Sequence, residues 1–435
     1  MRRGLASGAM ALRRLDAAGD RFGRRRLKGH GLLVALAFGG SVTAAAIADT
    51  APTGGAGDIQ RRLDTTIDRA IAEQRIVGTV VVLLCDGQVI YQRAAGYLDR
   101  EARTPMPENA IFRLASSSKA ITSATAMALI DRGQLTLDDT VTKWLPEFSP
   151  KSPDGSTPTI TVRELLTHTA GLDYPFWEPR DGPYRLARVS SGLDQPGLSM
   201  DEELSRITAA GLVSIPGTEW RYSLSVDVLG AVIAKAAGKP LPEVVRELIT
   251  LPLGMADTGF RVTDPNRLAV PYFSSVQHPG RMAAEQAVDF GDSISLVFAP
   301  ARAFDSASFP SGGAGMLGTA RDFTRFLEMI RLGGGTVLKP ETVRSMMANQ
   351  IGNRPILLGP GWGFGFGAAV VTDAAAAGTP LPNGSWSWSG AYGTSWFTDP
   401  KNGYTVVAFT DTAPEGDSGA FAMEIRGAVY GVAPR

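Results

Sequence analysis

The chain has 435 residues, 44% of them hydrophobic and 20% charged, which is enough for one large domain or two of ordinary size. Its formal net charge is zero, but residues 1–48 hold nine basic and two acidic side chains, so the remaining body is mildly acidic and has no basic stripe. This composition argues against disorder and against nucleic acid as a partner.

The N-terminal segment has the pattern of an export signal. A basic cluster at 24–28 precedes a short apolar run at 31–40, and small residues at 46–48 offer a cleavage site. The apolar run is too short to span a bilayer comfortably. We therefore expect residues 1–48 to export the protein, through the general or the twin-arginine route, so that the mature chain is periplasmic or secreted and has no stable membrane span. An uncleaved anchor is the alternative.

A short linker at 49–57 is expected before a helix and a β-hairpin. Isoleucine or leucine recurs every four residues from Ile59 to Ile71, which predicts an amphipathic helix. The segments TVVVLL and QVIYQRAAGY then flank Asp86-Gly87, a dipeptide typical of hairpin turns. The single cysteine, Cys85, excludes an internal disulfide and is expected to pack in the core.

Helical patterns dominate from about residue 115 to residue 254, and the stretch 256–310 is irregular and rich in Pro, Asp and Ser. Two more helical segments follow, at TARDFTRFLEMIRLGG and PETVRSMMANQ. The segments GWGFGFGAAVV, SWSWSG, SWFTDP and YTVVAFT then predict successive antiparallel strands, closed by a helix from about Ser418.

Strands at both ends of the chain with helices between them predict a sheet that both ends build together. We expect an α/β (α+β) fold in which residues 58–114 and 311–435 form an antiparallel sheet flanked by helices, and residues 115–310 form a mostly helical inserted domain. A cleft between the two parts is the expected site, with the stretches 173–200 and 256–310 as its walls.

The stretch FRLASSSK places a possible nucleophile at the start of the first of these helices. Residues three apart lie on one helix face, so Ser116 can approach Lys119, whereas Ser117 and Ser118 cannot share that geometry. The helix dipole at this end also favours developing negative charge. Ser116 is therefore the candidate nucleophile, although the tetrapeptide alone more often marks a helix cap beside a solvated lysine.

Four longer blocks follow in order: ITVRELLTHTAGL (160–172), PGTEWRYSLSVDVLGAVI (216–233), LPLGMADTGF (251–260) and SGGAGMLGTARDFTRF (311–326). Together with FRLASSSK they resemble the serine β-lactamase and penicillin-binding-protein superfamily, and class C β-lactamases in particular. The resemblance covers nearly everything from residue 78 to residue 410. It implies a class C β-lactamase-like fold.

The chain departs from that family at its second and third catalytic motifs. The second motif, Tyr-x-Asn, matches Tyr222 but has Leu224 in place of the asparagine. The third, Lys-Thr-Gly, matches Trp388-Ser389-Gly390, with tryptophan in place of the lysine. A cation there could pair with the carboxylate of β-lactams, whereas tryptophan packs against an acyl or alcohol group. Both departures resemble the family VIII carboxylesterases, which cleave esters.

The resemblance implies a role for each matched residue. Ser116 attacks the carbonyl carbon, Lys119 and Tyr222 share the acid and base roles, and the backbone N–H groups of Ser116 and Ala391 bind the oxyanion. Either Lys119 or Tyr222 could be the base. No metal or organic cofactor is expected, and the expected substrate-binding residues are Leu224, Trp388, Ser389 and Gly390.

The expected function is cleavage of a small-molecule ester, or an amide, through a Ser116 acyl-enzyme. A β-lactamase, a D-amino-acid peptidase, an acyltransferase and an idle binding protein on the same fold remain alternatives, and the oligomeric state is open. His168 follows an apolar helix, where a structural role is expected. GDSGA at 416–420 resembles a trypsin-like nucleophile loop, but nothing upstream matches that family's histidine block, so we interpret it as a turn.

Overall fold

The computed structural model describes residues 55–291 and 294–433. The expected export signal at 1–48 lies outside these ranges. The described residues form one compact unit, within which the division into a sheet domain and a helical domain stays a prediction. Helix α1 (Ala56–Ala72) begins two residues inside the segment assigned to the linker. Within the described ranges, no helix combines the length and apolar character needed to cross a bilayer.

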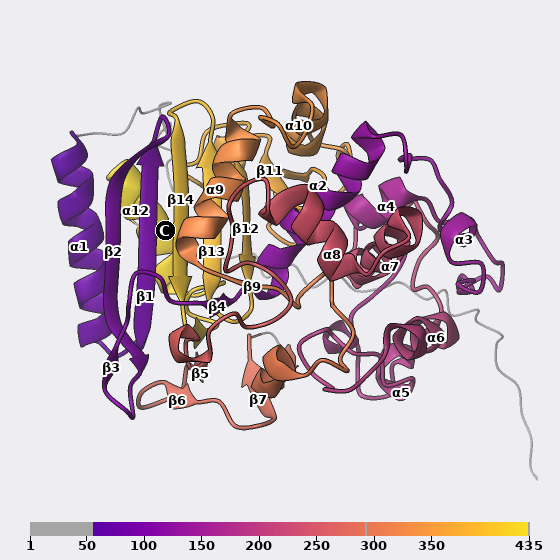
Figure 1. The fold of residues 1–435 in the computed structure, drawn as a ribbon, viewed down its shortest axis with the longest axis horizontal. Helices are drawn as coiled ribbons and strands as arrows, with labels where there is room; N and C mark the ends of the chain where they lie inside the picture. The colour runs from indigo at the N-terminus through magenta and orange to yellow at the C-terminus, as the bar shows by residue number, and fades with distance from the viewer. Residues whose placement is uncertain (1–54, 292–293, 434–435) are drawn as a thin grey trace, which may run out of the picture. The chain divides into compact units, whose positions relative to one another are not determined.

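An antiparallel sheet of eight strands lies at the centre of the fold, in the order β10-β11-β12-β13-β14-β1-β2-β3 (Figure 1). Strand β1 pairs with β14, so that Val81 lies opposite Ala408, and with β2 through the predicted turn at Asp86. The sheet built from both chain ends is thereby confirmed. The strands are β1 (Gly78–Cys85), β2 (Gln88–Asp99), β3 (Thr104–Pro105), β10 (Trp362–Phe364), β11 (Ala369–Val371), β12 (Trp386–Gly390), β13 (Thr394–Asp399) and β14 (Tyr404–Thr410).

Helices cover both faces of this sheet (Figure 1). On one face, Val81 and Leu83 pack in one cluster with α1 and α12 (Ala420–Tyr430), and Cys85 is half-buried against it. On the other face, Val80 and Val82 join a larger core that includes Phe323 of α9 (Ala320–Arg331). Because successive side chains of a strand point to opposite faces, a strand buried on both sides needs the unbroken apolar run seen in β1.

The helical part packs beside strand β12 and is organised around α2 (Ser118–Asp131), which is buried on almost every side. Small residues such as Ala, Ser and Thr dominate α2, which allows neighbouring helices to approach closely. The other helices are α3 (Val141–Trp144), α4 (Val162–Thr167), α5 (Pro183–Leu186), α6 (Met200–Ala210), α7 (Ser225–Ala237), α8 (Leu241–Val245), α10 (Pro340–Met347) and α11 (Ala374–Ala377).

The stretch predicted to be irregular contains several short elements. They are the paired strands β7 (Gln286–Asp289) and β8 (Ser295–Phe298), and the strands β5 (Tyr272–Phe273) and β6 (Gly280–Arg281). Strands β5 and β6 form a three-stranded sheet with β15 (Thr412–Ala413), which comes from outside this stretch. The pair β4 (Phe112–Arg113) and β9 (Leu317–Gly318) joins the segment before Ser116 to the segment before α9. These short strands were not predictable from alternation, because two to four residues carry no measurable period.

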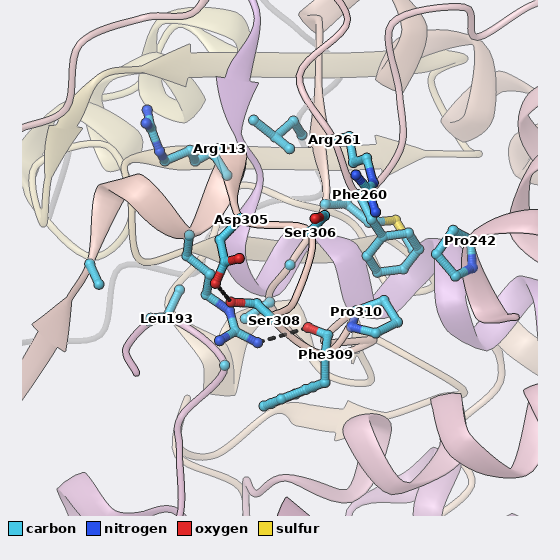
Figure 2. A pocket seen from close by; sticks show the side chains of 18 of the residues that line it. Arg113, Leu193, Pro242, Phe260, Arg261, Asp305, Ser306, Ser308, Phe309 and Pro310 are labelled. Carbon is cyan, nitrogen blue, oxygen red and sulfur yellow. Dashed lines mark hydrogen bonds between the residues drawn. The ribbon is translucent and has the colours of Figure 1, made fainter. Parts of the chain in front are cut away.

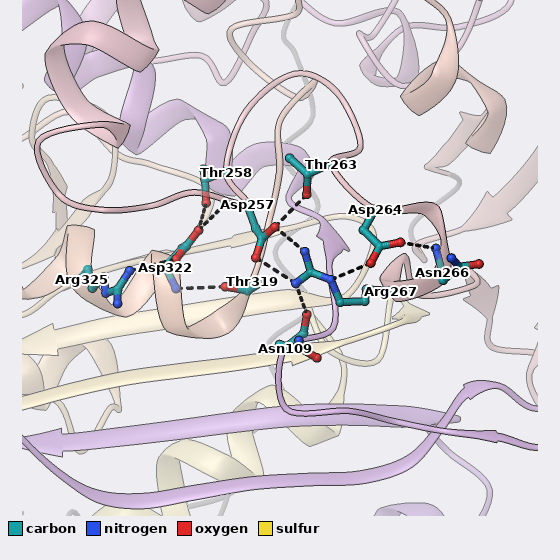
Figure 3. A network of polar contacts seen from close by, with 10 residues as sticks. All are labelled: Asn109, Asp257, Thr258, Thr263, Asp264, Asn266, Arg267, Thr319, Asp322 and Arg325. Carbon is teal, nitrogen blue, oxygen red and sulfur yellow. Dashed lines mark hydrogen bonds and ion pairs between the residues drawn. The ribbon is translucent and has the colours of Figure 1, made fainter.

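A polar network joins this irregular stretch to α9 and to Asn109, which lies before β4 (Figure 3). The Arg267 guanidinium donates to the carboxylate of Asp257 at 2.9 Å and to the backbone carbonyl of Asn109 at 3.1 Å. The backbone N–H of Asp257 donates in turn to Asp322 in the first turn of α9, at 2.9 Å. The hydrogen bond from Arg267 is the main cause that lowers the pKa of Asp257 below its usual 3.8.

We expect Arg267→Met to lower the free energy of unfolding by about 1–3 kcal/mol, because it leaves a partly buried carboxylate without its charged donor. The folded-state pKa of Asp257 lies below the unfolded one. The stabilisation is therefore complete above about pH 4 and is lost as the pH falls through the folded-state pKa. Denaturant unfolding at pH 7 and at pH 3 measures the difference.

Arg344→Met is the matched control, because Arg344 is exposed on α10. The control is expected to change stability by less than about 0.5 kcal/mol. Equal losses in the two variants at pH 7, or a loss in Arg267→Met that does not shrink at pH 3, would contradict the assigned role of the Arg267–Asp257 pair.

Candidate active site

Ser116 lies in a single 3-10 turn, Ala115–Ser117, directly before α2. Lys119 is fully buried in the first turn of α2, and its Nζ donates to Ser116 Oγ at 3.2 Å and to the carbonyl oxygen of Gly313 at 2.8 Å. The neighbouring serines face other groups. Ser117 Oγ contacts Thr394 Oγ1 at 2.9 Å, and Ser118 Oγ accepts from the backbone of Met316 at 3.1 Å. Only the first of the three hydroxyls meets the lysine.

Tyr222 lies on the other side of the lysine. Lys119 Nζ is 4.7 Å from the centre of the Tyr222 ring and 5.5 Å from that of Tyr174. The Trp177 indole N–H donates to the Tyr222 backbone carbonyl at 3.0 Å, which fixes the main chain at this point. The structure therefore brings together the hydroxyl, the amine and the phenol ring that are far apart in the sequence.

Strand β12 carries the third motif to the same place. Trp388 donates its indole N–H to Tyr222 Oη at 3.4 Å, and the two rings lie 5.3 Å apart. Gly390 allows β12 to lie close to the Ser116 turn, because a Cβ atom at this position would lie 2.2 Å from the carbonyl oxygen of Leu114, which comes just before that turn. Trp388 thus contacts the catalytic candidate Tyr222 and also lines the pocket that contains Ser116.

The pocket around Ser116 has a volume of about 430 Å³ and is largely apolar. Tyr222, Trp388, Ser389 and Ala391 line it with Ser116. Its apolar wall includes Tyr174, Phe176, Trp177, Leu193, Trp362 and Met423. Both stretches expected to form the walls contribute, 173–200 through Tyr174 and its neighbours and 256–310 through Phe290, Ile294 and Leu296. Trp362 and Met423 come from segments that the sequence analysis did not assign to the site.

Two of the expected substrate-binding residues do not line this pocket. Leu224 is fully buried in the main core, where its apolar side chain packs at the start of α7. Gly390 has no side chain, and its effect is to let β12 approach the Ser116 turn. Both are corrected here to structural positions, because an apolar residue in place of the motif's asparagine gains more from burial than from facing the pocket.

His168 supports the site from behind, without reaching Ser116. It ends helix α4 in a left-handed conformation, with φ of 56°, and is fully buried. Its Nδ1 accepts from the backbone N–H of Ser223 at 3.3 Å, and its ring lies 4.9 Å from that of Tyr222. Burial first, and the charge of Lys119 second, hold the pKa of His168 well below its usual range. A neutral structural histidine fits these contacts.

Asp227 holds the loop that receives the lysine. Its carboxylate accepts from Ser311 Oγ at 2.5 Å and from the backbone N–H of Gly313 at 3.2 Å. The carbonyl oxygen of Gly313 is the one that Lys119 contacts. Burial raises the pKa of Asp227, and the charge of Lys119 opposes that effect. Sequence reasoning missed this residue because its partners lie about 85 positions away.

A second pocket, of about 220 Å³, shares the lining residues Leu193 and Ala314 with the first. Figure 2 shows this second pocket from close by. In it Arg302 donates to the carbonyl oxygen of Phe309 at 2.8 Å, and Ser308 donates to Asp305 at 2.8 Å. None of the expected catalytic residues lines it. The pocket that contains Ser116 is therefore the candidate active site.

Metal chemistry has no obvious site in the part of the chain that the structure describes. Among residues 55–291 and 294–433, no group of three or more His, Cys, Asp or Glu side chains is arranged to hold a metal ion. The chemistry available at the pocket is that of a hydroxyl, an amine and a phenol, which together suit nucleophilic attack on a carbonyl carbon.

Comparisons with known proteins show the family to which the chain belongs. The β-lactamase family model matches residues 63–428. Esterase EstB of Burkholderia gladioli is 44% identical over 392 residues, which cover 89% of this chain and 100% of that protein. The structure of EstCE1, described as a hydrolase with promiscuous acyltransferase activity, is 42% identical with a TM-score of 0.82 and covers 86% of this chain and 99% of its own. Acyltransferase calJ of Penicillium decumbens is 30% identical over 302 residues, or 63% of this chain and 67% of its own. The chain belongs to the β-lactamase family, and within that fold it is a serine ester hydrolase.

Proposed function

We propose that Ser116 attacks the carbonyl carbon of a small-molecule carboxylic ester, and that Lys119 and Tyr222 together accept and return its proton. The contact between Lys119 Nζ and Ser116 Oγ is the single observation that carries this proposal. The tetrahedral intermediate takes that proton onto its alcohol oxygen and expels the alcohol, which leaves the acyl-enzyme. Water then attacks the acyl carbon and releases the acid and free Ser116. No cofactor takes part in the proposed reaction.

The surroundings of Tyr222 support its share in proton transfer. The Trp388 indole donates to the phenol oxygen, and a hydrogen bond of this kind strengthens when negative charge develops on its acceptor. The positive charge of Lys119 beside the ring acts in the same direction. Tyr222 is therefore our choice for the group that takes the proton from Ser116, with Lys119 stabilising the charge that forms.

The oxyanion is proposed to bind two backbone N–H groups, those of Ser116 and Ala391. Both residues line the pocket, and Ala391 directly follows β12, the strand that Gly390 holds against the Ser116 turn. Donors fixed in this way need no rearrangement when the tetrahedral intermediate forms, which is the main source of their effect on rate.

Acyl transfer to an alcohol is a second candidate outcome at the same site. The names of EstCE1 and of the calJ relative refer to acyltransferase activity. The apolar pocket wall supports the proposal, since an apolar alcohol would compete there with water for the acyl-enzyme. Cleavage of β-lactams or D-amino-acid peptides is less favoured, because Trp388 cannot pair with a carboxylate as a cation would.

Ser116→Ala is expected to lower kcat for a short-chain p-nitrophenyl ester by about 10³-fold or more, because among the described residues Lys119 donates to no other hydroxyl. The wild-type protein should also gain the mass of a fluorophosphonate probe at Ser116. Ser118→Ala is the matched control and should retain activity, because its hydroxyl only accepts from Met316. A folded Ser116→Ala protein with wild-type turnover would refute the assignment.

Trp388→Phe is expected to lower kcat for the same ester by about tenfold or more, because it keeps the ring but removes the hydrogen bond to Tyr222. Trp386→Phe on the same strand is the control, because the Trp386 indole nitrogen is buried without a hydrogen-bond partner. Equal losses of kcat in both variants would show that only packing matters at Trp388.

We also propose that the protein is exported from the cytoplasm, on the basis of the sequence pattern of residues 1–48. Expression of the full chain should give a processed protein outside the cytoplasm whose N-terminus lies near residue 49. Removal of residues 1–48 should leave an active enzyme in the cytoplasm. Full-length, unprocessed protein in the cytoplasmic fraction would contradict export.

A further inference from the structure

Among the described residues that line the active-site pocket, Asp417 is the one with an acidic side chain. It belongs to the GDSGA turn between β15 and α12, which the proposed mechanism does not use. Its backbone N–H donates to the carbonyl oxygen of Pro414 at 2.9 Å. The preceding Gly416 packs so closely on the sheet that a Cβ atom would lie 2.2 Å from the carbonyl oxygen of Gly393. The turn is therefore held in place, and Asp417 with it.

Asp417 lines the same pocket as Ser116 and Ser389. Burial raises its pKa to about 6, while a hydrogen bond from Ser389 and the positive charge of Lys119 lower it. Ser389 is the middle residue of the third motif, and Lys119 contacts Ser116. When ionised, the Asp417 carboxylate places a negative charge in the lining of the pocket that contains Ser116.

Two cationic side chains, Lys119 and Arg426, also lie at or beneath the surface of this pocket. Lys119 is fully buried beneath the surface of the pocket and already donates to Ser116 and Gly313. Arg426 on α12 lines the pocket, but among the described residues no ion pair joins it to Asp417. A bound substrate would therefore meet the Asp417 carboxylate as a separate negative group.

Aromatic side chains in the same pocket add a second attraction for cations. Tyr174, Phe176, Trp177 and Trp362 line the same pocket, and the faces of aromatic rings attract positive charge. Quaternary ammonium groups are bound well by such rings, because they bring little hydration to be lost. A carboxylate and aromatic rings in one pocket make up a site for an organic cation.

We propose that Asp417 makes this enzyme prefer esters that carry a positive charge, such as esters of quaternary or protonated amino alcohols, over neutral and anionic esters of the same shape. The inference rests on the proposed ester hydrolysis at Ser116. The same carboxylate repels substrates whose negative charge would lie beside the third motif.

Three butyrate esters of similar size test this preference. They are butyrylcholine, its uncharged analogue 3,3-dimethylbutyl butyrate, and an anionic analogue that ends in a sulfonate. Acid release in a pH-stat at pH 7.5 and low salt gives kcat/KM for each. We expect the cationic ester to exceed the neutral one by about tenfold, and the neutral one to exceed the anionic one.

Asp417→Asn should reduce the cationic-to-neutral ratio of kcat/KM to about one, because it keeps the shape of the side chain and removes its charge. Asp154→Asn removes the same charge from an exposed turn outside the pocket and should leave the ratio unchanged. In the wild-type enzyme, raising the salt concentration should lower the ratio, and this arm needs no variant.

The inference is overturned if the wild-type enzyme hydrolyses the neutral ester with no preference for the cation, or if folded Asp417→Asn keeps the preference. A preference for the anionic ester that Arg426→Gln abolishes would also overturn it, and would assign selectivity to Arg426. Failure of the proposed function gives a different result: the neutral ester is not cleaved, or Ser116→Ala cleaves it equally well.

Discussion

The buried amine of Lys119 is the feature on which the arrangement of this site depends. Burial of an ammonium group is costly unless hydrogen bonds replace its lost water. Here the carbonyl oxygen of Gly313 and the hydroxyl of Ser116 accept from it, and the Tyr222 ring lies against it. Asp227 then holds the Gly313 loop from behind. The groups around Ser116 are thus the same ones that stabilise the buried ammonium group of Lys119.

Parts of the fold and site follow from the sequence because they depend on local geometry. The buried strand β1 and the helix α1 have strong periods, and the spacing of Ser116 and Lys119 puts both on one helix face. Tyr222 and Trp388 lie more than a hundred residues from Ser116, so only the family resemblance could connect them to it. It also led us to expect Leu224 in the pocket, where the structure instead buries it in the core.

Asp417 shows why the remainder could not be predicted. Its sequence context resembles an unrelated nucleophile loop, and nothing in the five letters GDSGA says which way the side chain points. Its place in the pocket follows from the tight packing of Gly416 against the sheet and from the pairing of Ser389 with Ser395 across β12 and β13. Such contacts join segments distant in the chain, and residue spacing does not encode them.

The position of β1 also has a consequence for how the enzyme comes into being. This early strand must wait for β14 near the other end of the chain, because Val81 pairs with Ala408. Until the ribosome has released the last strands, the backbone N–H and C=O groups on this side of β1 have no partner strand. The residues of the Ser116 turn are therefore synthesised while the central sheet still lacks β10 to β14, so the active site can form only after the last strands have been made.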